Sequence, residues 1–347
     1  MRKAREQGVS IIKVAKLAGV SKSTVSLVIN NNPAIPPSTA LKVRQAMSAL
    51  GYVPRPREQR KGPKPDWKEA RRARNIALVT LGIPSAVLRA PLYNDVLHGV
   101  AADVRERGHR LTVNHVPERG ELGVEEILRG GADGFLLFGR GESENAARAL
   151  RGFPCVSLMG AEEPRTWCDW VSYDDPAAGR VAAQYLLEQG HRRCAFLGKE
   201  NQPRARSFAE TIRAAGGECI VLEDRGLFLA GEDTHAVDHA AVDALVDRLC
   251  ALTPRPTGLF SWADMLTAAL YPSLYRRDLR VGREITVVSC NNEWPLLLGL
   301  QPRPAVVDLQ AVKVGTRAVE QLLWRMQHPR EPRVVLTLTP SLAPPGL

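Results

Sequence analysis

The first fifty residues contain three short segments in which hydrophobic residues recur every three to four positions, a pattern that predicts amphipathic helices. The apolar positions of the first segment are Ile11, Val14, Ala15 and Ala18. Those of the second are Val25, Val28 and Ile29, and those of the third are Val43, Ala46, Met47 and Leu50. Three helices of this length can share one small core. We therefore expect a small all-α unit at the start of the chain.

The residues between these segments favour a helix-turn-helix arrangement. Ser10 and Ser21 precede the first and second helices, where a serine side chain can accept a hydrogen bond from a backbone amide. Gly19 can supply the turn because glycine takes a positive φ without steric cost, and Gly51 can end the third helix. The outward face of the second helix would then carry Lys22, Ser23, Thr24, Ser26 and Leu27. Small polar and basic side chains of this kind suit the major groove of DNA, although the pattern alone also fits an ordinary helical hairpin with a polar face.

From residue 75 onward, apolar strand-like runs alternate with helical segments. The predicted strands are residues 76–81, 111–114, 134–138, 155–158, 194–197, 219–222, 258–260 and 285–289. The predicted helices of the second half include residues 177–189, 204–215 and 236–252. Continuous apolar strands between helices are typical of parallel sheets that are covered on both faces. The sequence therefore predicts a helix-turn-helix head followed by an α/β body of two doubly wound subdomains.

Charge is distributed unevenly along the 347 residues, whose formal net charge is +10. Residues 1–74 contain 17 Lys and Arg against 4 Asp and Glu, whereas residues 75–347 contain 30 against 33. The excess positive charge thus belongs to the head and to the segment that follows it. A basic head on a nearly neutral body is typical of proteins that bind phosphate backbones and release counterions.

Several classes of protein are disfavoured by what the sequence lacks. No apolar run approaches the roughly 20 residues that span a bilayer, and the start of the chain does not resemble a signal peptide, so we expect a cytoplasmic protein without a membrane partner. The six cysteines are scattered and read as reduced thiols. No catalytic or phosphate-loop motif is present, so we expect neither an enzyme nor a bound cofactor. His235 and His239 stand four residues apart, but we favour a polar helix face over a metal site.

Specific residues of the head resemble the opening of the lactose-repressor (LacI/GalR) family. The matching residues, in order and spacing, are Ala18-Gly19-Val20-Ser21, Thr24-Val25-Ser26, Asn30, Leu50-Gly51-Tyr52 and Pro54. The resemblance implies a regulator that binds double-stranded DNA, most often as a repressor. The candidate DNA contacts are Ser10, Ser21, Lys22, Ser23, Thr24, Ser26, Leu27, Asn30, Arg55 and Arg57. One such head is too small for tight specific binding, so we expect a homodimer on a pseudo-palindromic operator.

The resemblance also implies a division of the chain and a periplasmic-binding-protein-like body. We expect a helix-turn-helix domain at 1–54, a basic linker or hinge at 55–74, and a two-lobed effector-binding and dimerisation domain at 75–347. The expected first lobe comprises about 75–174 and 303–332, and the second about 175–302 and 333–347. In the family, a hinge helix inserts a leucine into the minor groove. Lys61 stands near that position here, so we expect no such wedge. An ordered hinge and a solvated tether both remain open for the linker.

A small-molecule effector, such as a sugar or a nucleoside, is implied for a cleft between the lobes. The candidate effector contacts are Tyr93, Arg204, Trp262, Asp264 and Asn291. Arg204 occupies an arginine position of the family and Asp264 an aspartate position, while Trp262 offers a stacking face. The sequence departs from the family at Ser207, Ala263, Asn291 and Asn292. Because Asn291 replaces an aspartate, we expect the cleft to tolerate a carboxylate or phosphate on its ligand.

Two alternatives remain open at this stage. The departures in the cleft are compatible with a DNA-binding regulator whose body senses nothing. A cytoplasmic solute-binding protein, or an enzyme on the same body, is less favoured because the chain carries a DNA-binding pattern and lacks a catalytic constellation.

Overall fold

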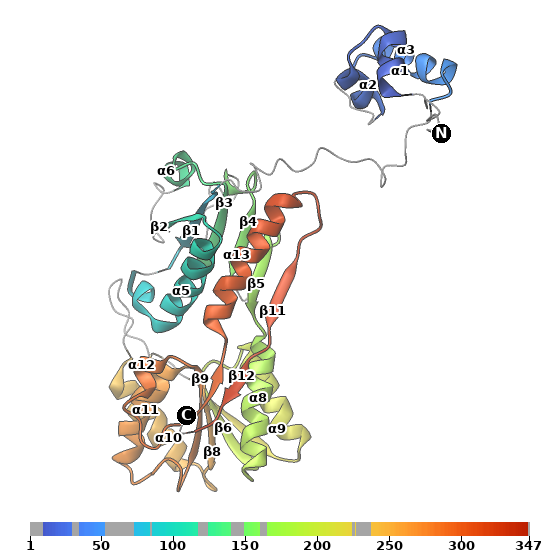
Figure 1. Cartoon of the computed structure of the whole chain (residues 1–347). Helices are drawn as coiled ribbons and strands as arrows, with labels where there is room; N and C mark the ends of the chain where they lie inside the picture. The colour runs from blue at the N-terminus through green and yellow to red at the C-terminus, as the bar shows by residue number, and fades with distance from the viewer. Residues whose placement is uncertain are drawn as a thin grey trace, which may run out of the picture. The chain divides into compact units, whose positions relative to one another are not determined.

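The structure, a computed structural model, describes residues 10–29, 35–52, 73–83, 85–116, 124–139, 149–159, 165–223, 226 and 237–345. The chain divides into two compact units, Met1–Arg72 and Ala73–Leu347. We refer to these units as the head and the body (Figure 1).

In residues 10–29 and 35–52, the head forms the helices α1 (Ile11–Ala18), α2 (Lys22–Ile29) and α3 (Pro37–Ala49). Their apolar faces meet in one core, whose buried members are Val14, Ala15, Val25, Val28, Val43 and Ala46. Because each helix buries only one stripe, its opposite face remains available for a partner. The three helices and their shared core confirm the prediction from hydrophobic spacing.

Two of the three residues predicted to cap or turn the chain around α1 and α2 do so. Gly19 has a φ of 65°, in the left-handed region that favours glycine. The Oγ atom of Ser21 accepts a hydrogen bond from the backbone N–H of Thr24 at 3.1 Å, as expected of a capping serine. The prediction for Ser10 was wrong: Ser10 occupies the N-cap position, but its side chain makes no capping hydrogen bond. Its backbone carbonyl instead accepts from Lys13 at 2.9 Å.

The body is built on two six-stranded sheets. The strands of the first sheet, in spatial order, are β11 (Val335–Leu338), β5 (Asp169–Tyr173), β4 (Cys155–Leu158), β3 (Gly134–Gly139), β1 (Asn75–Leu81) and β2 (Arg110–Val116), all parallel. Those of the second are β12 (Ser341–Ala343), β10 (Ala305–Asp308), β9 (Thr286–Asn291), β8 (Gly258–Ser261), β6 (Arg193–Leu197) and β7 (Glu218–Leu222). Only β12 runs antiparallel to its neighbour in this second sheet. We call the parts built on the first and second sheets lobe 1 and lobe 2.

Helices cover both faces of each sheet. Lobe 1 carries η2 (Ser85–Arg89), α5 (Pro91–Glu106), α6 (Val124–Arg129) and α13 (Ala311–Gln327). Lobe 2 carries α8 (Asp175–Glu188), α9 (Pro203–Ala214), α10 (His239–Ala251), α11 (Asp264–Tyr275) and α12 (Trp294–Leu297). Successive residues of β1 enter opposite cores, with Ile76 and Leu78 in one and Ala77 and Val79 in the other. This burial on both faces confirms the predicted doubly wound subdomains.

The chain passes between the lobes after β5, after β10 and again after β11, and Figure 1 shows β11 in one lobe and β12 in the other. These passages correct the expected lobe boundaries. β10 pairs with β9 in lobe 2 and β11 pairs with β5 in lobe 1, so 303 and 333 are not the points of crossing. The boundaries were wrong because an apolar run predicts a strand but does not specify which sheet supplies its hydrogen-bonding partner.

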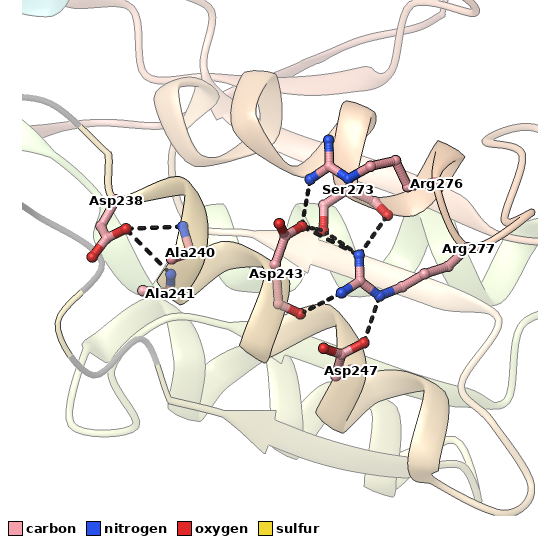
Figure 2. A network of polar contacts seen from close by, with 8 residues as sticks. All are labelled: Asp238, Ala240, Ala241, Asp243, Asp247, Ser273, Arg276 and Arg277. Carbon is pink, nitrogen blue, oxygen red and sulfur yellow. Dashed lines mark hydrogen bonds and ion pairs between the residues drawn. The ribbon is translucent and has the colours of Figure 1, made fainter.

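A polar network joins α10 to α11 on lobe 2 (Figure 2). The Oδ1 atom of Asp243 accepts from Ser273 Oγ at 2.5 Å and from Arg277 Nη1 at 3.2 Å. The hydrogen bond from Ser273, with further donation from Arg276, lowers the pKa of Asp243 to about 2. Since Arg277 also donates to Asp247 at 2.6 Å, this network fixes the two helices side by side.

The same region corrects the expected start of a helix. Asp238 is the N-cap of α10, and its Oδ1 atom accepts from Ala240 N at 2.9 Å (Figure 2). The helix therefore begins at His239 rather than at residue 236, because the capping carboxylate ends the extended backbone before it. His235 lies outside the described residues. Within the described ranges, no group of three or more His, Cys, Asp or Glu side chains is placed to hold a metal ion.

Two glycines allow α5 and α13 to approach each other closely in lobe 1. A Cβ atom added at Gly99 would lie 2.0 Å from the carbonyl oxygen of Val312, and one added at Gly315 would lie 2.3 Å from that of Val96. Such contacts with backbone atoms cannot be relieved by a side-chain rotation. The packing of lobe 1 therefore depends on glycine at both positions.

We expect Gly99→Ala to lower the free energy of unfolding by about 3 kcal/mol, because α13 must move away from α5. Urea denaturation followed by circular dichroism measures this loss. Gly152→Ala is the matched control: no atom lies within 4 Å of its added Cβ, and we expect a change below about 1 kcal/mol. Equal stability of the two variants would contradict the close packing of α5 and α13.

Candidate functional site

The exposed face of α2 carries the residues expected to contact DNA. Lys22, Ser23 and Ser26 are exposed, and Leu27 keeps 38% of its surface accessible. Thr24 is half-buried. This polar face is opposite the buried Val25 and Val28, so packing of the head core orients it outward. The structure thus brings these candidate contacts onto one helix face.

Hydrogen bonds among hydroxyl groups organise the first turn of α2. The Oγ atom of Ser21 lies 2.6 Å from that of Ser23 and 2.9 Å from Thr24 Oγ1. The amino end of a helix carries a partial positive charge and orphan N–H groups, which favours phosphate nearby. Lys22 adds a full positive charge at the same end. Asn30, Arg55 and Arg57 lie outside the described residues and stay predictions.

In the body, Arg204 is held by several groups at once. It is 5% exposed near the start of α9, and its Nε atom donates to Asp175 Oδ1 at 2.6 Å. Its Nη1 atom donates to the carbonyl oxygen of Trp262 at 2.8 Å and to Cys290 Sγ at 3.1 Å, while Nη2 donates to the Tyr173 hydroxyl at 3.2 Å. Since Tyr173 ends β5 in lobe 1, the guanidinium joins the two lobes.

Asp264 is fully buried at the first residue of α11. Its Oδ2 atom accepts from the backbone N–H of Glu293 at 2.5 Å, and its Oδ1 atom accepts a short hydrogen bond from Ser289 Oγ. Burial raises the pKa of Asp264 to about 7. A carboxyl group with this pKa changes its charge near neutral pH, which makes it sensitive to any group that approaches.

The remaining candidates lie around the same boundary between the lobes. Asn291 has a φ of 110°, and its Nδ2 atom donates to Glu293 Oε2 at 3.0 Å. Trp262 is half-buried beside Arg204. Tyr93 is 5% exposed in the first turn of α5, and its ring meets that of Phe138 edge to face with centroids 5.1 Å apart.

Glu293 is one of two residues that sequence analysis missed, and it connects these groups. Its side chain is buried, with 3% of the residue exposed. Its Oε1 atom accepts from the backbone N–H of Leu92 at 3.1 Å, so a lobe 2 carboxylate reaches the first turn of α5 in lobe 1. Asn291 and Asp264 both bond to Glu293 as well. The signal in the sequence is an acidic residue two positions after the end of a strand, but an acidic residue there is also common as a helix cap.

Asp175 was missed for a different reason. It belongs to an acidic pair at the start of α8, where acidic residues usually act as helix caps. Asp174 does cap the helix, accepting from Ala177 N at 2.8 Å. Asp175 instead accepts two hydrogen bonds from Arg204, one from the Nε atom of Arg204 and one from its backbone N–H at 3.1 Å. The sequence could not separate these two roles because both carboxylates occupy the same local pattern.

Comparison with known proteins identifies the family. The model of the bacterial regulatory proteins of the lacI family matches residues 10–55, and that of the periplasmic binding protein-like domain matches residues 183–344. The HTH-type transcriptional regulator CelR of Thermobifida fusca is 30% identical over 291 residues, which cover 79% of each protein. The chain belongs to the lacI family of bacterial regulatory proteins.

Other lacI-family members match over nearly the whole chain. The ribose operon repressor of Escherichia coli K12 is 26% identical over 349 residues, covering 96% of this chain and 98% of the repressor. A solved complex of the regulator CelR with cellobiose aligns with a TM-score of 0.62 and 25% identity, covering 97% of this chain and 99% of that one. The head is therefore the DNA-binding domain of a transcriptional regulator. In the part of the body and head that the structure describes, no helix is long and apolar enough to cross a membrane.

We expect Lys22→Ala to weaken operator binding by about 1–3 kcal/mol and to relax the preference at one base pair of each half-site, because Lys22 extends from the exposed start of α2. Selection from random DNA followed by sequencing measures this preference. Lys42→Ala removes the same charge from α3 and should leave the base preference unchanged. Identical preferences in wild type and Lys22→Ala would refute base contact by Lys22.

The raised pKa of Asp264 leads us to expect that the free energy of unfolding depends on pH. The folded chain keeps the Asp264 proton up to about pH 7, whereas the unfolded chain releases it near the ordinary value of 3.8. The folded state therefore binds more protons in this window, and stability is lost as pH rises from about 4 to about 7.

Relative to Asp264→Asn, we expect the wild type to lose stability across that window by on the order of a few kcal/mol. The asparagine is neutral throughout, so the difference isolates Asp264 from other titrating groups. Urea denaturation at several pH values measures it. A difference that stays constant from pH 4 to pH 7 would show that the carboxyl of Asp264 is not perturbed by burial.

Proposed function

We propose that this lacI-family member is a homodimeric repressor whose DNA affinity is set by a sugar or nucleoside bound between the lobes. The observation that carries this proposal is the polar cluster at the lobe boundary, which comprises Arg204, Trp262, Asp264, Asn291 and Glu293. These groups come from the carboxyl ends of β8 and β9 and from the start of α9. In open α/β sheets, ligands bind at this end of the strands.

The chemistry of this cluster suits a hydroxyl-rich ligand. Asp264 and Glu293 offer carboxylate acceptors and Arg204 offers a planar fork of donors. Hydroxyl groups both donate and accept, so they can replace the internal hydrogen bonds of these side chains one for one. The relatives support the same class, because one is a ribose operon repressor and another forms a complex with cellobiose.

Coupling to DNA follows from the connections between the lobes. The body joins the linker at Ala73, directly before β1 of lobe 1, while most of the polar cluster belongs to lobe 2. A ligand that binds one angle between the lobes better than another shifts the population of that angle. A change in lobe 1 then alters how two heads are presented to the two operator half-sites, and coupling of this kind typically changes affinity about 5- to 150-fold.

A homodimer gives the two heads that a pseudo-palindromic operator needs. Three large apolar side chains of lobe 2 are exposed: Tyr275 is 73% exposed, Leu298 52% and Trp294 47%. Covering such side chains with a second copy of the chain would remove apolar surface from water. We place the dimer in the bacterial cytoplasm, because the DNA that it binds is there.

A DNA-binding regulator with a non-sensing body is the second candidate. It is favoured by the internal use of the cluster, since Asp264 is fully buried and Arg204 is 5% exposed with protein partners on both branches of its fork. A ligand would have to displace these partners. The experiment below separates the two candidates.

We expect ribose, cellobiose or a nucleoside to change the operator dissociation constant of the full chain about 5- to 150-fold, and Arg204→Gln to lose this response. Fluorescence anisotropy measures both dissociation constants, on an operator fragment first isolated from the DNA that the full chain retains. No response to any sugar or nucleoside would support the non-sensing body.

Deletion of residues 1–74 provides the control for DNA binding. The shortened chain should retain no operator, because the excess positive charge and α2 are gone, yet its melting temperature should still rise with the active compound. Operator binding that persists in the shortened chain would contradict the assignment of DNA binding to the head.

A further inference from the structure

A cavity of about 290 Å³ lies in lobe 1, at the amino ends of β4 and β5. Its lining comes from the turn before β4, from the residues that lead into β5, and from the segment that joins α13 to β11. Asp169 at the start of β5 belongs to this lining, whereas Tyr173 at the other end of the same strand contacts Arg204. The cavity is therefore separate from the polar cluster at the lobe boundary.

A buried ion pair holds one wall of this cavity in place. Asp169 is 1% exposed and accepts from the Nε and Nη2 atoms of Arg325 at 2.9 and 2.7 Å. The same guanidinium donates to the carbonyl oxygens of His328, Glu331 and Pro332 at 3.1, 2.6 and 2.8 Å. These bonds use every N–H group of Arg325. Arg325 is thus satisfied within the chain, and it fixes the segment that follows α13.

Two other arginines of the lining keep donor groups available. The Nε atom of Arg333 donates to the carbonyl oxygen of Cys168 at 2.7 Å, which orients its guanidinium, but neither of its Nη atoms has a hydrogen-bond partner among the described residues. The Cζ atom of Arg151 lies 6.0 Å from the centroid of the Trp167 ring. In the part of the chain that the structure describes, no carboxylate forms an ion pair with either arginine. The lining therefore presents two cations that can bind a further group.

The charge balance of the lining favours an anion with two negative charges. The pair of Arg325 and Asp169 is neutral, which leaves the charges of Arg151, Arg333 and Glu331. Glu331 is exposed, so water and salt screen its carboxylate. The planar donor fork of a guanidinium matches the oxygens of a phosphate group, and two such forks balance a dianion. Phosphate therefore suits this lining better than a singly charged carboxylate does.

We propose that this cavity is a second ligand site, which takes a small compound that carries a phosphate group. Arg151 and Arg333 bind the phosphate oxygens, and the half-buried Trp167 adds an apolar surface for the rest of the ligand. The ligand is small, because a volume of about 290 Å³ is close to the lower end of the range for such sites, about 300–1,000 Å³. The site goes beyond the proposed function, since it shares no residue with the polar cluster or with the head.

The test uses inorganic phosphate as the probe and the full chain as the protein. Arg151→Gln and Arg333→Gln each remove one donor fork at an exposed position, so we expect both variants to fold. Glu331→Gln removes the opposing charge. Arg330→Gln is the matched control, because Arg330 is an exposed arginine of the same segment that does not line the cavity.

In isothermal titration calorimetry, we expect Arg151→Gln and Arg333→Gln each to weaken phosphate binding about tenfold or more, because each loses charged hydrogen bonds. Glu331→Gln should tighten binding about two- to fivefold, since an exposed like charge is removed. Arg330→Gln should bind as wild type does. Phosphate that binds to the basic head contributes equally to every titration, so the differences between variants report on the cavity.

Hydrogen exchange locates the bound phosphate. It should slow exchange of the backbone amides of residues 328–335 in wild type and in Arg330→Gln, but not in Arg333→Gln. If Arg333→Gln fails to fold, Arg333→Lys keeps the charge and should still bind phosphate more weakly than wild type, because lysine lacks the fork.

Equal phosphate affinity in wild type, Arg151→Gln and Arg333→Gln would overturn the proposal. Acetate that binds as tightly as phosphate would overturn the assignment of the site to a phosphate group. Because the experiment requires neither operator nor sugar, its failure is distinguishable from failure of the proposed function, which shows itself in operator binding.

Discussion

The buried guanidinium of Arg204 is the constraint on which the boundary between the two lobes depends. A positive charge can be buried only with partners, and removing one of them leaves an uncompensated charge that typically costs several kcal/mol. Here the partners come from the end of β5, the start of α8, the residue directly after β8, and the end of β9. One side chain thereby binds three segments of the chain, at residues 173–175, 262 and 290, and the first of these is the first passage between the lobes. The geometry of the candidate ligand position follows from that fixation.

A second layer of the same boundary is acidic. The side chain of Glu293 accepts a hydrogen bond from the backbone N–H of Leu92 in lobe 1. The side chain of Asp264 in turn accepts one from the backbone N–H of Glu293. Arg204 and Glu293 thus hold the lobes from two sides, one with a cation and one with an anion. Such contacts can be exchanged for those of a ligand at little net cost in hydrogen bonds, provided the ligand offers donors and acceptors in matching places. This exchange gives a physical basis for coupling ligand binding to the relative position of the lobes.

Some residues of the candidate site were predicted from the sequence, whereas their partners were not. Arg204 and Asp264 were found because each occupies a position at which the resembled family carries the same type of residue. Their partners were not found, because Tyr173, Cys290 and Glu293 lie 31, 86 and 29 residues away from them in the chain. The departure at Asn291 looked like a loss of charge. In the folded chain Asn291 instead serves as a donor, to the carboxylate of Glu293 two residues later.

The sequence by itself determined the three-helix head, the outward face of α2 and the alternation of strands and helices in the body, because hydrophobic spacing and helix-capping residues act over a few positions. Only the tertiary structure decided that β10 belongs to lobe 2 and β11 to lobe 1, since hydrogen-bonding partners in a sheet are chosen across the chain. It also decided which buried charges meet. Burial and pairing of a charge depend on segments that are distant in sequence, and no local pattern encodes them.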